Sequence, residues 1–344
     1  MTRSRRKFDP GCVYELCFRV RLDLPFVPTL FIKYLLKSII ARTQREFRVE
    51  LCHMVWMGNH PHIIVVCWDA NELKNFYMEI QKKCTEVIKR LIGAPELTLW
   101  SGSVYVSKLA DLGKCINRIA YLYANPAEAN LVDKIEHYPG LNTYRNFQNG
   151  FSIPRYQYKE TMKWTRYGKV PVLPSARLSQ FQQISFVNAL KKMADDEHDY
   201  VITPNAWLKA FNIMDPEEVR EYNQAVLNRI REYEKAAHDR RQEEGRTVLR
   251  PSELINMKIM TPHIPKKKDR KVHIQAIDEE LRKEEVLAYK KFCEKCAECY
   301  LQAKAGQKDV DWPLNAFIPW IPPRVIDFEN EDDAPWVNGT GPII

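Results

Sequence analysis

Residues 49–67 read VELCHMVWMGNHPHIIVVC, and this stretch decides the fold of the first half of the chain. Its two ends, 49–57 and 61–67, are rich in β-branched and other apolar residues, which predicts two strands. The Gly58-Asn59 pair between them is typical of a tight hairpin turn, although His60 could also begin the second strand. The stretch therefore predicts an antiparallel hairpin.

Periodic segments lie before and after this hairpin. Alternating β-prone residues at 11–24 predict a strand, and an apolar period over 30–46 predicts a helix. A second amphipathic helix is predicted from about residue 70 to Gly93, since glycine commonly ends helices.

The pattern continues with a strand or hairpin at 97–107 and a helix at 109–124 that meets Pro126. The resulting order is strand, helix, strand, strand, helix, strand, helix. That order predicts an α+β fold in which an antiparallel sheet carries helices on one face.

Beyond residue 150 the periodicity weakens. Helices are predicted where it returns, at 178–194, 204–211, 215–242 and 275–304. A basic tract at 266–271 predicts an exposed loop, and a Pro- and Trp-rich tail follows from residue 312. The expected organisation has three parts: a domain of residues 1–150, a linker and helical region of 151–245, and a helical extension of 246–344.

The net charge of +8 is unevenly distributed. Residues 1–150 carry 21 Lys and Arg against 14 Asp and Glu, whereas the remainder carries 31 against 30. A basic half is typical of a protein that meets a polyanion, and equally of a charge that favours solubility. No apolar stretch is long enough for a bilayer span or a secretory signal, so we expect a cytoplasmic protein without a membrane partner.

Two histidines stand two positions apart at the start of the second predicted strand. On a strand, His60 and His62 would point to the same face about 6.5–7 Å apart, which allows both imidazoles to bind one cation. Two polar side chains on a solvated strand face would give the same pattern. The sequence shows no third histidine ligand.

The helix before Pro126 has two tyrosines on different faces. Tyr123 belongs to the apolar stripe and is predicted to pack in the core, whereas Tyr121 lies about 160° away around the axis. The face of Tyr121 also carries Lys114, Asn117, Arg118 and Asn125. A tyrosine beside basic and amide groups is a candidate nucleophile, and a surface tyrosine near a helix end is the alternative.

The two motifs together resemble those of the single-tyrosine HUH transposases, and in particular the REP-associated group. The first, MGNHPHIIV at 57–65, is similar to the family's Met-Pro-Asn-His-Val-His followed by aliphatics. The second, YLYANPAEANLV at 121–132, is similar to Tyr-Ile-X-X-Asn-Pro-Val-Arg-Ala-Gly-Leu-Val. The resemblance covers about residues 3–148. Glu128 and Asn130 stand where the family has arginine and glycine, so DNA contacts after this helix are expected to differ.

The resemblance implies a ferredoxin-like sheet with the histidines on a central strand and the tyrosine on a flanking helix. It implies that His60, His62 and Asn125 hold Mg²⁺ or Mn²⁺, and that Tyr121 attacks a phosphodiester of single-stranded or hairpin DNA. The product would be a 5′-phosphotyrosine and a free 3′-hydroxyl.

The candidate DNA-binding residues share a basic or aromatic side chain near these motifs: Arg3, Arg5, Arg6, Lys114, Arg118 and Trp56, with Trp68 as the alternative to Trp56 for base stacking. Two other functions remain open, a replication or conjugation nickase of the same chemistry and a domesticated protein that binds hairpins without cutting. A missing phosphate loop argues against the large replication initiators and relaxases. Monomer and homodimer are equally compatible with the sequence.

Overall fold

The computed structural model describes residues 8–102, 104–263, 273–307, 309–316 and 318–319. They fall into two compact units, Phe8–Glu285 and a second one that includes the described residues from Val286 onward. The site-forming residues all belong to the first unit. Candidate residues Arg3, Arg5 and Arg6 and the basic tract at 266–271 lie outside the described residues.

The central sheet has five strands. Their order is β2 (Val49–Trp56), β3 (Pro61–Cys67), β1 (Cys12–Cys17), β4 (Tyr105–Leu109) and β7 (Ile274–Gln275). Neighbouring strands are antiparallel except β4 and β7, so the sheet is mixed where the sequence predicted an antiparallel one. The hairpin between β2 and β3 forms as predicted, and β1 places its residues beside β3 at the middle of the sheet.

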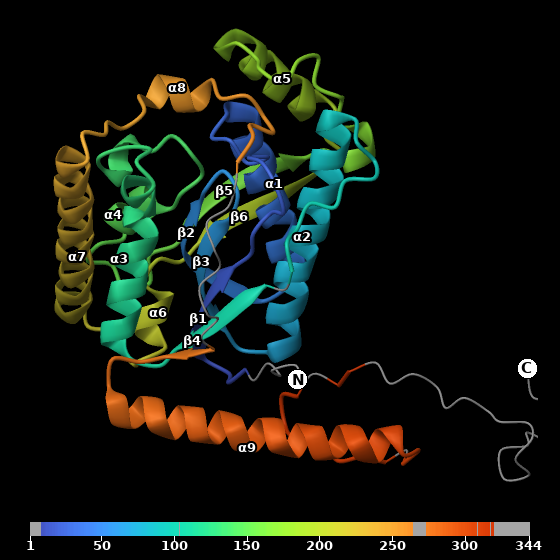
Figure 1. Ribbon diagram of the computed structural model, residues 1–344, viewed down its shortest axis with the longest axis vertical. Helices are drawn as coiled ribbons and strands as arrows, with labels where there is room; N and C mark the ends of the chain where they lie inside the picture. The colour runs from blue at the N-terminus through green and yellow to red at the C-terminus, as the bar shows by residue number, and fades with distance from the viewer. Residues whose placement is uncertain (1–7, 103, 264–272, 308, 317, 320–344) are drawn as a thin grey trace, which may run out of the picture. The chain divides into compact units, whose positions relative to one another are not determined.

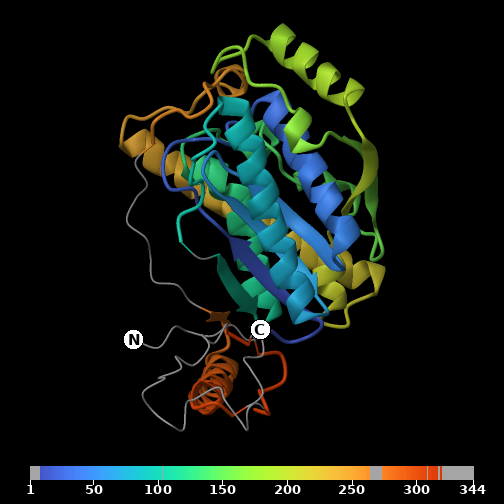
Figure 2. The same cartoon turned by 90° about the vertical axis from the view of Figure 1, so that its right-hand side faces the viewer.

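Helices cover both faces of this sheet, whereas the pattern predicted one. The helices α1 (Leu30–Glu46) and α2 (Ala70–Ile92) lie side by side over one face, and α3 (Leu112–Glu128) lies over the other (Figures 1 and 2). The reason is visible in β3, all of whose residues are buried, so that both of its faces need a cover. The α+β class and the predicted order of elements are confirmed.

Local signals set the ends of the two long helices. The Asp69 carboxylate accepts hydrogen bonds from the backbone amides of Asn71 and Glu72 at 2.8 and 2.9 Å, which caps α2, and Gly93 ends it with φ of 68°. Helix α3 continues through Pro126 to Glu128, although we expected it to stop there. Proline lacks an amide donor, but the Pro126 carbonyl still accepts from the amide of Leu131, which closes the last turn.

The chain after residue 150 holds a second sheet that the sequence did not predict. It pairs β5 (Tyr158–Trp164) with β6 (Asp196–Ile202) in antiparallel register. The helical segments after α3 are η1 (Ile135–His137), α4 (Tyr144–Asn149), η2 (Tyr167–Lys169), α5 (Gln180–Lys192), α6 (Ala206–Lys209), α7 (Pro216–Glu243), α8 (Pro251–Ile255) and α9 (Glu279–Lys304).

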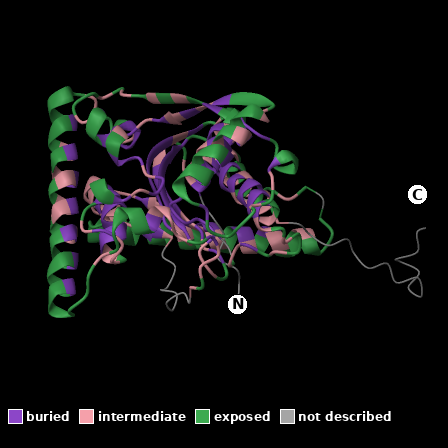
Figure 3. Cartoon of the chain, turned by 90° about the horizontal axis from the view of Figure 1, so that it is seen from above, coloured by how far each residue is buried: buried purple, intermediate pink, exposed green. Residues whose placement is uncertain are grey.

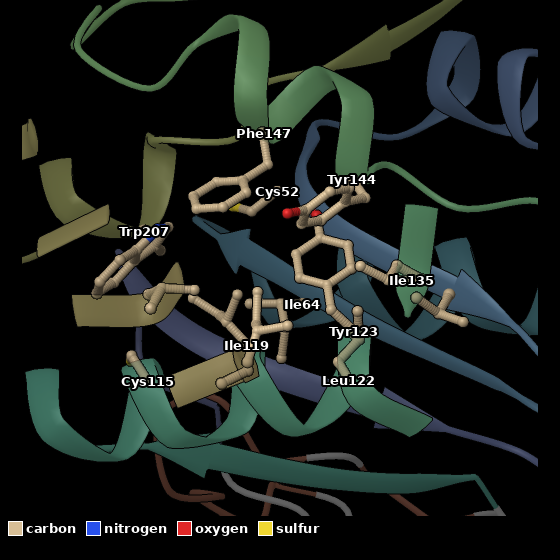
Figure 4. Packing of buried hydrophobic residues seen from close by; sticks show 14 of the residues in the cluster. Cys52, Ile64, Cys115, Ile119, Leu122, Tyr123, Ile135, Tyr144, Phe147 and Trp207 are labelled. Carbon is tan, nitrogen blue, oxygen red and sulfur yellow. The ribbon is translucent and has the colours of Figure 1, made fainter. Parts of the chain in front are cut away.

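The apolar core between α3 and the sheet contains residues of both the predicted domain, 1–150, and the predicted linker region, 151–245. Ile119 and Tyr123 of α3 are buried with Ile64 of β3, Phe147 of α4 and Trp207 of α6 (Figure 4). Buried residues concentrate in the sheet and on the helix sides that face it (Figure 3). No break in packing therefore marks the expected boundary at residue 150. Among the described residues, no helix combines the length and apolarity that a bilayer crossing requires.

Candidate active site

The two histidines lie next to each other at the start of β3. His60 is the last residue of the turn, where its carbonyl accepts from the amide of Met57 at 2.8 Å, and His62 is the second residue of the strand. Their ring centroids are 5.0 Å apart, and the two residues are 8% and 7% exposed. Both imidazoles are therefore close enough to face one bound ion.

Each imidazole uses its Nδ1 atom in a hydrogen bond with a neighbouring side-chain oxygen. His62 Nδ1 lies 3.0 Å from Glu15 Oε1, and His60 Nδ1 lies 2.6 Å from Asn59 Oδ1. Because a carboxylate or amide oxygen can only accept, both Nδ1 atoms carry a proton, and in the neutral imidazoles both Nε2 atoms present a lone pair. Within the described residues neither Nε2 has a hydrogen-bond partner. This is the protonation pattern of metal-binding histidines.

Glu15 of β1 is a charged residue that binds both His62 and Arg118. It is fully buried and also accepts from the Arg118 guanidinium, with Nε 2.8 Å from Oε2. Burial opposes its ionisation, but the His62 hydrogen bond and the Arg118 charge outweigh burial and hold its pKa at about 2. Sequence reasoning missed Glu15. The available signal was a single acidic residue inside the apolar run CVYELC.

Tyr121 of α3 lies against His62 and Arg118, the two residues that bind Glu15. Its ring centroid is 5.9 Å from that of His62 at 86°, and the Arg118 guanidinium carbon lies 4.7 Å from the Tyr121 ring centroid. The tyrosine is half-buried. Burial raises the pKa of its hydroxyl, and the Arg118 charge acts in the opposite direction. The ring is thus placed beside the histidines with a cation over it, which would stabilise a phenolate.

Tyr123 occupies the opposite side of α3, as the sequence predicted. It is fully buried among apolar side chains (Figure 4). Its hydroxyl lies 2.9 Å from His53 Nδ1 and 3.0 Å from Thr143 Oγ1. Burial raises the pKa of Tyr123 well above its usual value. Its hydroxyl is used in the core and is not available for chemistry.

Asn125 lies one turn after Tyr121 on α3 and is 7% exposed. Its side chain has no hydrogen-bond partner among the described residues, while its backbone carbonyl accepts from the amide of Ala129 at 2.9 Å. Three His, Cys, Asp or Glu side chains do not meet in a metal-binding group anywhere in the described part of the chain. A metal here would consequently need an amide oxygen as well as the two imidazoles.

The prediction that Trp56 stacks on a DNA base is wrong. This residue is 1% exposed and packs edge-on against Phe18 and Phe26, with ring centroids 6.1 and 5.3 Å away, so no base can stack on it. The two phenylalanines come from irregular segments whose approach the sequence did not indicate. The alternative, Trp68, is 51% exposed and follows the far end of β3.

The two basic candidates on α3 differ in availability. Arg118 is committed to the buried Glu15 and to the Tyr121 ring, so its role is inside the site. Lys114, one turn earlier, is partly buried, and burial followed by the nearby Arg118 charge lowers the pKa of its ammonium group.

Two of the residues that depart from the transposase motifs, Asn130 and Glu128, have definite structural settings. Asn130 adopts φ of 57°, a left-handed conformation that suits the glycine of the motif and that asparagine tolerates. Glu128 forms an ion pair with Arg240 of α7 at 3.0 Å. Helix α7 also places Tyr233 beside Tyr121, with ring centroids 6.3 Å apart. Sequence reasoning missed Tyr233, because nothing in the sequence connects it with a residue so distant along the chain.

Comparisons with known proteins give a partial likeness. No model of a protein family matches the chain, and no curated protein matches it. A solved structure of a REP-associated tyrosine transposase bound to a REP hairpin is similar at 20% identity and a TM-score of 0.37, over 44% of this chain and 87% of that one.

Proposed function

We propose that this chain is a metal-dependent single-strand DNA endonuclease and strand transferase of the transposase type, with Tyr121 as its nucleophile. The observation that supports this most is the contact of the Tyr121 ring with His62, whose own ring adjoins His60. A nucleophile and two imidazoles with free Nε2 lone pairs therefore lie in one half-buried site.

The proposed ion is Mg²⁺ or Mn²⁺, as the resemblance to the transposases implies. His60, His62 and the Asn125 side-chain oxygen would hold the ion, and Glu15 would keep the His62 ring in the required tautomer through its Nδ1 hydrogen bond. A bound ion would polarise the scissile phosphate and offset the charge that develops on its oxygens.

The chain's own residues would perform the transfer. The Tyr121 oxygen forms a bond to phosphorus, the bond from phosphorus to the 3′ oxygen breaks, and the tyrosine proton passes through water to that leaving oxygen. Arg118 over the ring stabilises negative charge on the phenol during attack. The phosphotyrosine ester retains the free energy of the broken bond, so a 3′-hydroxyl can reverse the step without ATP.

The proposed substrate is single-stranded or hairpin DNA. The basic N-terminal half and a site that takes one exposed phosphodiester both favour an extended single strand. The choice of DNA substrate and the cleavage chemistry are separate parts of the proposal, and one experiment tests both.

The test incubates the purified chain with Mn²⁺ and a library of hairpin DNAs labelled at the 3′ end. Cleavage through a 5′-phosphotyrosine leaves the 3′ label on the protein, so a labelled band should survive denaturing electrophoresis. Tyr121→Phe should remove this band and Tyr123→Phe should keep it. Hairpin binding without a covalent band in any metal would replace the cutting enzyme by the non-cutting hairpin binder.

A further inference from the structure

Helices α3 and α7 run parallel and in register beside Tyr121. Three contacts between them join residues that are each 112 positions apart in the sequence: Asn117 with Arg229, Tyr121 with Tyr233, and Glu128 with Arg240. A constant separation over three turns is possible only when two helices rise together in the same direction. Figure 1 shows α7 alongside α3 over this length.

This register is held by the core. Val226, Ile230 and Ala237 of α7 are fully buried, and the first two belong to the same apolar cluster as Ile119 and Leu122 of α3. Burying these apolar side chains stabilises the helix interface, because it removes apolar surface from water. The side chains at the edge of the interface, Tyr233 among them, therefore have fixed positions relative to Tyr121.

Tyr233 and Arg229 repeat the arrangement of Tyr121 and Arg118. The Arg229 guanidinium carbon lies 4.9 Å from the Tyr233 ring centroid, against 4.7 Å for Arg118 and Tyr121. The two tyrosine rings meet edge to face at 84°. The Tyr121 ring is thus bounded by Arg118, His62 and Tyr233.

Arg229 retains a charge that can be offered to a ligand. Its Nε atom donates to Asn117 Oδ1 at 3.1 Å, which holds the side chain toward the Tyr121 face of α3. Its ion-pair partner is Glu232, and the side chains of Arg229 and Glu232 are 42% and 60% exposed. Such a solvated ion pair contributes little to stability, so an incoming phosphate can replace the glutamate.

We propose that α7 supplies the second half of the DNA site: Arg229 binds a backbone phosphate next to the scissile one, and Tyr233 is a positioning residue for the Tyr121 ring. This inference rests on the proposed function for its choice of ligand. It extends the site beyond residues 1–150, the part of the chain that resembles the transposases.

The Arg229 part is tested by binding, without cleavage. In a Tyr121→Phe background, affinity for a fluorescein-labelled random-sequence single-stranded DNA is measured over a series of salt concentrations. Arg229→Ala should weaken binding about fivefold and reduce the slope of log K against log salt by about 0.7, the value for one lost phosphate contact. Arg229→Lys should restore most of that slope.

The matched control is Arg220→Ala on the same helix. Arg220 also pairs with a glutamate three residues away, Glu217, and it lies roughly 14 Å before Arg229 along the axis. Arg220→Ala removes the same charge from the same helix. Because Arg220 lies away from Arg229, this variant should leave affinity and slope close to those of the parent protein. Equal effects of the two alanine variants would overturn a phosphate site at Arg229.

The Tyr233 part is tested by the rate of adduct formation at saturating DNA. Tyr233→Ala should lower this rate about tenfold with little change in DNA affinity, because a misplaced nucleophile costs rate. Tyr233→Phe should react like the parent protein, since the ring makes the contact. Equal losses in both variants, with unchanged thermal unfolding, would contradict positioning by the ring.

The two proposals can fail separately. If the parent protein forms no adduct but Arg229→Ala lowers affinity and salt slope, the cutting function fails and the phosphate site on α7 stands. If the parent protein forms the adduct while Arg229→Ala and Tyr233→Ala behave like Arg220→Ala, the inference fails and the cutting function stands.

Discussion

Two tyrosines on α3 each lie edge to face against a histidine of the central sheet, yet their surroundings are opposite. Tyr123 meets His53 of β2 at 5.6 Å and 89°, and Tyr121 meets His62 of β3 at 5.9 Å and 86°. The ring geometry is almost the same in both pairs. What differs is the access of solvent and the charge around each pair.

The Tyr123 pair is sealed in the core. Burial lowers the pKa of His53 to about 3, and the His53 Nε2 atom is buried without a hydrogen-bond partner in the described structure. The Tyr121 pair adjoins the ionised Glu15 and the Arg118 guanidinium and remains partly open. The comparison shows the same tyrosine–histidine contact in two settings, one buried in the core and one partly open beside charged groups, where it would suit the phosphoryl transfer proposed above.

The largest expected difference between the pairs concerns their histidines. His62→Ala should slow adduct formation about 1,000-fold, because it removes a proposed metal ligand and with it the several kcal/mol of transition-state stabilisation that the ion would supply. His53→Ala should leave the rate of the folded protein unchanged but lower its stability by about 3 kcal/mol through the cavity it creates. Single-turnover kinetics and urea unfolding measure the two effects. A slow but stable His53→Ala protein would break the comparison.

Glu15 should make the open site sensitive to acid. Its folded pKa of about 2 lies below the ordinary value of 4.5, so its contribution to stability is complete above pH 4.5 and is lost as the pH falls toward 2. The loss should be on the order of 3 kcal/mol. Unfolding free energies of the parent protein and of Glu15→Gln across this window would show it. Parallel pH profiles for the two proteins would contradict a low pKa at Glu15.

Glu15→Gln should also weaken metal binding. The amide can donate to His62 Nδ1, which moves the imidazole proton to Nε2, and loss of such a supporting carboxylate typically costs about 10–100-fold in metal affinity. Titration calorimetry with Mn²⁺ measures this without DNA or cleavage. Glu50→Gln, which changes a partly exposed glutamate of β2, is the matched control and should bind Mn²⁺ like the parent protein.

The smallest expected effects are changes in stability when the hydroxyl of Tyr123 or of Tyr121 is removed. Tyr123→Phe removes a hydroxyl that bonds to His53 and Thr143, and should lower stability by about 1–2 kcal/mol while adduct formation continues. Tyr121→Phe should change stability by less than about 0.5 kcal/mol, because its hydroxyl makes no hydrogen bond within the described residues. Thermal unfolding of both variants compares them directly, and a reversed order of the two would mean that the helix faces are assigned wrongly.

The parts of the fold that were predictable have strong local signals. Helix α1 spans Leu30–Glu46 as its apolar period indicated, and Asp69 and Gly93 bound α2 as their capping chemistry predicts. The facing of Tyr121 and Tyr123 follows from helical periodicity. His60 and His62 are adjacent as strand spacing predicted, although His60 ends the turn before β3. These features depend only on residues close together in the chain.

The parts that were missed depend on distant contacts. Strand β5 has the sequence YKETMKW, in which charged residues interrupt any apolar run, and it is defined by pairing with β6 about 40 residues later. Trp56 is buried because Phe18 and Phe26 cover it, and Glu15 reaches His62 only because β1 lies beside β3. Tyr233 reaches the site through helix register, which no local pattern contains.

The account's central claim is that Tyr121 carries the DNA, and peptide mapping of the covalent adduct tests it most directly. Tryptic cleavage after Arg118 gives a peptide that contains both Tyr121 and Tyr123, so fragment ions between the two must locate the nucleotide. The account predicts the nucleotide on Tyr121. A nucleotide on Tyr123 or Tyr233, or an adduct that forms equally well in Tyr121→Phe, would contradict it.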